Sequence, residues 1–100
     1  MEPAFFDGFK VLDNPLSAYD FNPFNHIGRS NNKVFEATRL TDGKKFALKE
    51  FEYTEKTKDR CKNEISLLES IEHENIVAIY DKFIVRSKDS SQVYFAMDLA

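Results

Sequence analysis

One change of hydrophobic period divides this sequence and limits the folds that it can adopt. Residues 21–51 form strand-like runs separated by Asn31-Asn32 and Asp42-Gly43, which tolerate the positive φ of a tight hairpin. Residues 54–76 instead place apolar side chains at helical spacing, with Thr54 as the expected cap. The segments "NIVAIYDKFIV" and "QVYFAMDLA" then return to a strand pattern. We therefore expect an α+β fold with a five-stranded antiparallel sheet and one main helix between its third and fourth strands.

Length and charge exclude several classes of protein. One hundred residues make at most one small domain, and 14 basic against 17 acidic residues give a net charge of −3. We therefore expect neither a nucleic-acid nor a membrane partner. No signal peptide or membrane span is visible, which favours a soluble cytoplasmic protein. Cys61 is the single cysteine and accompanies only His26 and His73, so we expect no disulfide and no metal site.

The first 20 residues show no sustained period of either kind. They mix aromatic side chains such as Phe5, Phe6 and Phe9 with glycine and proline. We expect residues 1–20 to be an irregular leader. Its aromatic side chains could dock on the following domain or on a partner, and docking on the domain is the simpler alternative.

Two charged residues stand in unusual places. In "GKKFALKEF" Lys49 shares a strand face with the small Ala47, because side chains alternate along a strand. Glu64 lies beside the apolar stripe of the predicted helix. A poorly solvated charge is costly alone, so pairing Lys49 with Glu64 would explain both positions. The simpler alternative is that Lys49 extends to solvent and Glu64 lies at the helix margin.

The stretch 21–100 resembles the N-terminal lobe of a protein kinase. "IGRSNNKVFEA" resembles the glycine-rich loop and the strand after it, and "FALK" resembles the V-A-I-K element. "NEISLLESIEHENIV" resembles the helix with its glutamate and the following strand, and "VYFAMDLA" resembles the strand that leads into the hinge. Narrower features, including "YDFNPFNHIGRS", resemble the serine/threonine kinases that phosphorylate translation initiation factor 2 alpha.

The resemblance implies an ATP site. Lys49 would hold the phosphates, and Glu64 would orient Lys49. The remaining implied contacts with ATP come from Ile27, Gly28, Ser30, Val34, Ala47, Met97 as gatekeeper, and the hinge backbone of Asp98 and Ala100. Magnesium would be a cofactor only where a C-terminal lobe is present.

The glycine-rich loop departs from the family pattern. Gly28 is present, but Ser30 stands at the second glycine position and Asn32 nearest the third. Side chains there crowd the approach of backbone amides to phosphates, so altered nucleotide binding is expected.

The chain ends at Ala100, in the predicted hinge, and contains no H-R-D or D-F-G element. We therefore expect the polypeptide alone to be inactive and to require a kinase C-terminal lobe. The alternative is a non-catalytic, kinase-like interaction or regulatory module that pairs with another kinase. A third possibility is an unstable product without function, because a cut at the hinge exposes apolar surface.

Overall fold

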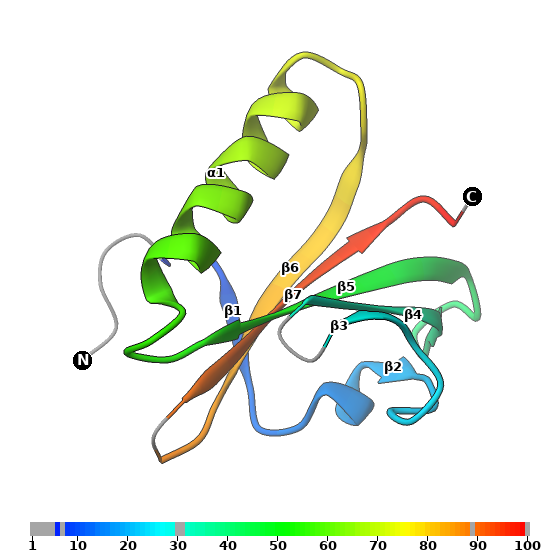
Figure 1. Ribbon diagram of the computed structural model, residues 1–100. Coiled ribbons are helices and arrows are strands. Elements are labelled where there is room, and N and C mark those ends of the chain that lie inside the picture. Colours follow the sequence, from blue (N-terminus) through cyan, green and yellow to red (C-terminus); the bar gives the residue numbers. More distant parts are fainter. Residues whose placement is uncertain (1–5, 7, 30–31, 89, 100) are drawn as a thin grey trace.

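A computed structural model of the chain describes residues 6, 8–29, 32–88 and 90–99. One α-helix crosses one face of a curled sheet (Figure 1). The elements, in chain order, are β1 (Lys10–Leu12), the 3-10 helix η2 (Pro15–Ser17), β2 (Tyr19–Asp20), β3 (Ile27–Arg29), β4 (Asn32–Arg39), β5 (Lys45–Tyr53), α1 (Lys58–His73), β6 (Ile79–Arg86) and β7 (Ser91–Met97).

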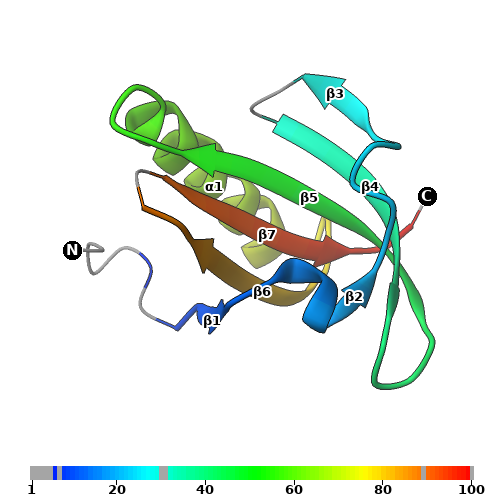
Figure 2. The same ribbon diagram turned by 90° about the horizontal axis from the view of Figure 1, so that it is seen from below.

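The sheet contains seven strands and is mixed, which corrects the prediction of five antiparallel strands. Its order is β1-β6-β7-β5-β4-β2, with β3 also paired to β4 (Figure 2). Every pairing is antiparallel except that of β1 with β6. The additional strands arise because residues 10–12 and 19–20, which the sequence predicts to be irregular, pair with distant segments. Strands this short carry no readable period of their own.

β2 and β3 are two parts of one interrupted edge strand along β4. Asp20 lies opposite Thr38 and Ile27 opposite Val34, so the six residues 21–26 face only the three residues 35–37. The surplus forms a turn in which Phe24 N donates to Asn22 Oδ1 at 3.0 Å. The bulge turns Phe24 outward, and its side chain is 93% exposed.

Each face of the sheet has its own apolar cluster. The face away from α1 carries the first core cluster: Tyr19, Phe21, Phe35, Ala37, Phe46, Leu48, Phe83, Val85, Tyr94 and Ala96. The face beneath α1 carries the second, which we call the helix-side cluster: Phe6, Phe9, Phe51, Cys61, Ile65, Leu68, Ile84, Val93 and Phe95. Strand alternation explains this division, because residues an odd number of positions apart on one strand, such as Leu48 and Phe51, lie on opposite faces.

The leader packs on its own domain, as the simpler alternative held. Tyr19 is 0% exposed, stacks on Phe83 with ring centroids 5.7 Å apart, and donates from its hydroxyl to Asp81 Oδ2 at 3.0 Å. Phe6 and Phe9 are buried in the helix-side cluster. The described part of residues 1–20 therefore contributes to both cores.

α1 starts later than its sequence pattern predicts. The N-cap is Thr57 rather than Thr54, and the helix runs for 16 residues. Thr54 and Thr57 instead form a turn before the helix, in which Thr57 N donates to Thr54 Oγ1 at 3.2 Å. Asn75 ends the helix with φ 63, a left-handed conformation that asparagine tolerates. No helix among the described residues is long and apolar enough to span a membrane.

Candidate functional site

The strand register brings most of the predicted site residues to one face of the sheet. Val34 lies between Ile27 on β3 and Lys49 on β5, each directly across from it. Ala47, two residues before Lys49, lies across from Met97 on β7. Residues directly opposite share a face and lie about 4.5–5.5 Å apart at Cβ. This face of the sheet, part of which α1 covers, thus presents a small apolar surface next to Lys49.

A cleft of about 340 Å³ opens at the β3 edge of this face. Ile27 and Val34 line it, and Ile27 is 79% exposed. Leu99, which is 42% exposed and follows β7, also lines the cleft. The sequence prediction named Asp98 and Ala100 from this segment but missed Leu99, although its position directly after an apolar strand was a usable signal.

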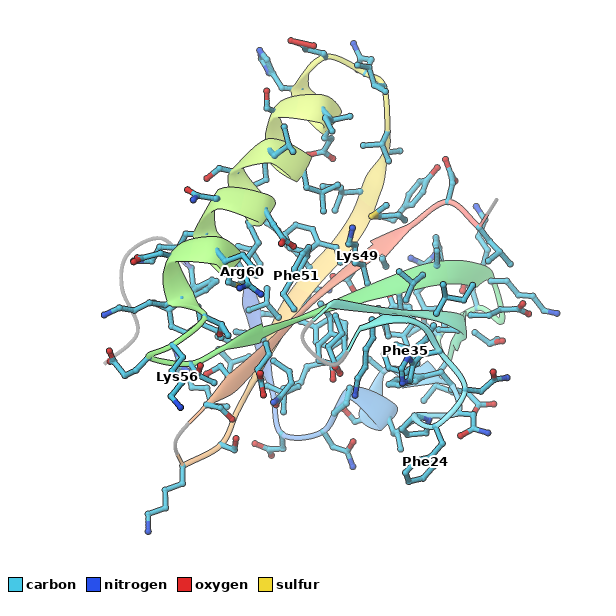
Figure 3. All side chains as sticks on the ribbon, viewed as in Figure 1. Phe24, Phe35, Lys49, Phe51, Lys56 and Arg60 are labelled. Atoms are coloured by element: carbon cyan, nitrogen blue, oxygen red, sulfur yellow. The ribbon has the colours of Figure 1, made fainter. Side chains whose placement is uncertain are left out.

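Lys49 lies near an aromatic ring. Its ammonium is 5.4 Å from the centroid of Phe51, two residues along the same face (Figure 3). A cation over an aromatic face is attracted by the ring quadrupole. Among the described residues, no ion pair joins Lys49 to Glu64. Their pairing stays a prediction.

Glu64, on α1, borders the same small cavity as Phe51. With Phe51, Arg60 and Cys61, Glu64 lines this cavity of about 10 Å³ between the helix and β5. Phe51 therefore lies near the Lys49 ammonium and also beside the cavity that Glu64 lines. Strand alternation could have identified Phe51, since it stands two residues after Lys49.

The segment after β7 is tied to β6 through its side chains. Tyr80 donates from its hydroxyl to Asp98 Oδ1 at 2.8 Å, and this hydrogen bond raises the pKa of Tyr80. The side chain of Asp98 is thereby fixed against Tyr80, while its backbone belongs to the segment that borders the cleft. Among the described residues, no group of three or more His, Cys, Asp or Glu side chains could hold a metal ion.

The glycine-rich loop is described only in part. Gly28 has φ 106, a conformation that favours glycine over residues with a side chain. The predicted site residues Ser30 and Ala100 lie outside the described residues.

Cys61, which lines the same small cavity as Glu64, has a raised pKa. Burial, and to a lesser extent the charge of Glu64, raises the pKa of its thiol from 9.0 to about 12. The pKa of the Cys61 thiol is higher in the folded chain than in the unfolded one. The contribution of the neutral thiol to the free energy of unfolding is therefore fully present below about pH 9 and is lost as the pH rises towards 12.

We therefore expect the free energy of unfolding to fall between about pH 9 and 11, and to fall less steeply in Cys61→Ala. Urea unfolding of both proteins at pH 8, 10 and 11 measures this. Tyr19 and Tyr94, whose pKa values are also raised, are present in both proteins, so their contribution cancels in the comparison. Identical pH slopes would contradict the assignment to Cys61.

Residues 21–100 match the family model of the protein kinase domain, and the chain belongs to this family. The single helix over a curled sheet is consistent with the N-terminal lobe of such a domain. β1 and β2 both lie before the matched residues.

The chain is also similar to one curated serine/threonine kinase. It is 33% identical over 97 residues to the probable serine/threonine-protein kinase fhkA of Dictyostelium discoideum. The similarity covers 90% of this chain but 16% of that relative's length.

Proposed function

We propose that the chain binds ATP on the face that carries Lys49, as the N-terminal lobe of a serine/threonine protein kinase. The observation that carries the proposal is the register that sets Ile27, Val34 and Ala47 beside Lys49 on one face. An apolar surface suits a flat purine, and a neighbouring ammonium suits the phosphates attached to it.

The residues fit ATP in three parts. The purine would lie in the cleft between Ile27, Val34 and Leu99, with Ala47 leaving room beneath it and Met97 at its back. The backbone of Asp98 and Ala100 would supply hydrogen bonds to the purine edge. Lys49 would hold the phosphates beneath a loop that includes Gly28 and Ser30, and Glu64 would orient Lys49. Bound ATP supplies the phosphoryl group for transfer to protein, and magnesium would neutralise its charge.

Narrower assignments stay predictions. The resemblance to kinases that act on translation initiation factor 2 alpha, and the need for a C-terminal lobe, belong to this proposal. So do the intracellular location and the partners of the protein.

The alternative, a non-catalytic interaction module, loses one of its two arguments. It drew on the aromatic leader as a surface for a partner. Phe6 and Phe9 are buried in the helix-side cluster, where a partner cannot reach them without displacing the leader. Its other argument, the substituted glycine-rich loop, stands.

Lys49→Ala is expected to weaken ATP binding by about 10- to 100-fold, because a hydrogen bond to a charged group contributes about 1.5–3 kcal/mol. Titration of the 100-residue chain with a fluorescent ATP analogue measures the dissociation constant. This experiment requires binding only, not phosphoryl transfer.

Lys45→Ala is the matched control. Lys45 lies four residues earlier on β5, on the same face and with the same charge, but its side chain pairs with Glu36 at 3.9 Å. We expect Lys45→Ala to bind ATP as the unmodified chain does. If the two substitutions weaken binding equally, the attraction between ATP and the chain is non-specific. If ATP binding saturates and is unchanged in Lys49→Ala, the proposed site is wrong.

A further inference from the structure

Few side chains hold α1 against the sheet. Cys61, Ile65 and Leu68 are its buried residues, one on each successive turn. An isolated helix of this length is marginal in water, so its position depends mainly on packing of this stripe. Two polar contacts with β6 add to it, from Lys82 to Glu69 and from the backbone N–H of Ile79 to Glu72. Any side chain that completes the cluster around the stripe therefore affects where α1 lies.

Phe6 and Phe9 complete that cluster from the N-terminal segment. Phe9 meets Phe95 edge to face at 5.6 Å between ring centroids, and Phe6 meets Tyr53 at 5.0 Å. The two phenylalanines also meet each other at 5.3 Å. Edge-to-face pairs contribute beyond the area that they bury.

A lysine links this aromatic pair to the helix itself. The Lys82 ammonium lies 4.8 Å from the centroid of the Phe9 ring and 3.4 Å from Glu69 Oε2 on α1. A second link fixes the backbone of the segment, because β1 pairs in parallel with β6 and Lys10 contacts Asp81 at 3.1 Å. The segment is thus attached to β6 on one side and to the surroundings of α1 on the other.

The backbone attachment of the segment is short. β1 has three residues and forms the edge of the sheet, so few backbone hydrogen bonds retain it. A cleft of about 290 Å³ lies between Gly8 and Lys10 of the segment and Glu69 and Glu72 of α1. Release of Phe6 and Phe9 would remove part of the cluster while the core on the opposite face stays complete.

We propose that Phe6 and Phe9 are positioning residues that hold α1, and with it Glu64, at the distance from β5 that Lys49 requires. This inference rests on the proposed function for the roles of Lys49 and Glu64. The control over the position of α1 stands independently of it.

Cys61 provides a native probe of the position of α1. Its thiol is buried between the helix and the sheet, so alkylation requires α1 to move or the chain to unfold. We expect Phe9→Ala, in the 100-residue chain, to increase the alkylation rate of Cys61 by iodoacetamide at least about tenfold through local opening.

Phe46→Ala separates local opening from general instability. Phe46 is buried more deeply than Phe9, but it belongs to the core on the opposite face of the sheet. At denaturant concentrations where both variants have the same free energy of unfolding, Phe9→Ala should react faster at Cys61 than Phe46→Ala. Phe9→Leu should restore most of the protection. Where the alanine variants fail to fold, the milder truncations Phe9→Val and Phe46→Val are compared in the same way. Equal rates at equal stability would overturn the inference.

A second measurement tests the link to Glu64. Glu64→Gln should weaken binding of the fluorescent ATP analogue in the unmodified chain and have little further effect in Phe9→Ala. An undiminished effect in Phe9→Ala would show that the aromatic pair does not position Glu64. Absence of ATP binding in the unmodified chain would instead overturn the proposed function, while the alkylation result would still decide the role of Phe9.

Discussion

Removal of residues 1–20 is expected to leave a chain that is already unfolded at 25 °C and shows no cooperative thermal transition. The deletion takes Tyr19 from one core and Phe6 and Phe9 from the other. Loss of a large buried aromatic side chain costs about 3–5 kcal/mol. Three such losses are comparable to the total stability of about 5–15 kcal/mol that is typical of a small domain.

Thermal unfolding followed by circular dichroism, with chains 1–100 and 21–100 compared side by side, measures this effect. Tyr19→Phe is the control within the leader, because it keeps the stacked ring and removes only the hydroxyl that donates to Asp81. We expect it to cost about 1 kcal/mol. A chain 21–100 that unfolds at the same temperature as the longer chain would contradict a structural role for the leader.

The boundary of the family match therefore differs from the boundary of the folded unit. The match starts at residue 21, and the sequence also predicts a boundary there. Yet Leu12 and Ala18 pack against the first core cluster, and Tyr19 lies within it. A family pattern marks where residues resemble those of relatives, whereas a folded unit ends where burial ends.

The helix and the long strands could be predicted because each repeats its period several times. Cys61, Ile65 and Leu68 mark one helical stripe, and Phe46 and Leu48 mark one strand face. The pairing of β1 with β6 could not be predicted, since it joins Lys10 to Phe83 across most of the chain and involves only three residues. Aromatic residues without a period, such as Phe6 and Phe9, show that burial is possible but not where.

The candidate site was predictable to a similar extent. Alternation alone places Ala47 and Lys49 on one face, and the register bears this out. The relation of Lys49 to Glu64 depends on how α1 lies over β5, which no local pattern specifies. Phe51 was not predicted as part of the site, although its ring centroid lies 5.4 Å from the Lys49 ammonium on the same strand.

Phe95→Ala is expected to lower the free energy of unfolding by about 3–5 kcal/mol, the range for truncating a fully buried aromatic side chain. Phe95 is 0% exposed and meets Phe9 at 5.6 Å and Phe51 at 6.0 Å between ring centroids. Its removal opens the helix-side cluster at the point where the leader, β5 and β7 meet. Urea denaturation of the variant, extrapolated to water, measures the loss.

Phe24→Ala is the control of the same residue type. Its ring is 93% exposed on the bulge between β2 and β3, so we expect a change within about 0.5 kcal/mol. Because Phe95 lies directly across from Lys49 in the register, Phe95→Ala should also weaken ATP binding in the part of the population that stays folded. If Phe95→Ala were as stable as Phe24→Ala, the helix-side cluster would not be a core, and neither the position of α1 nor the geometry around Lys49 could depend on it.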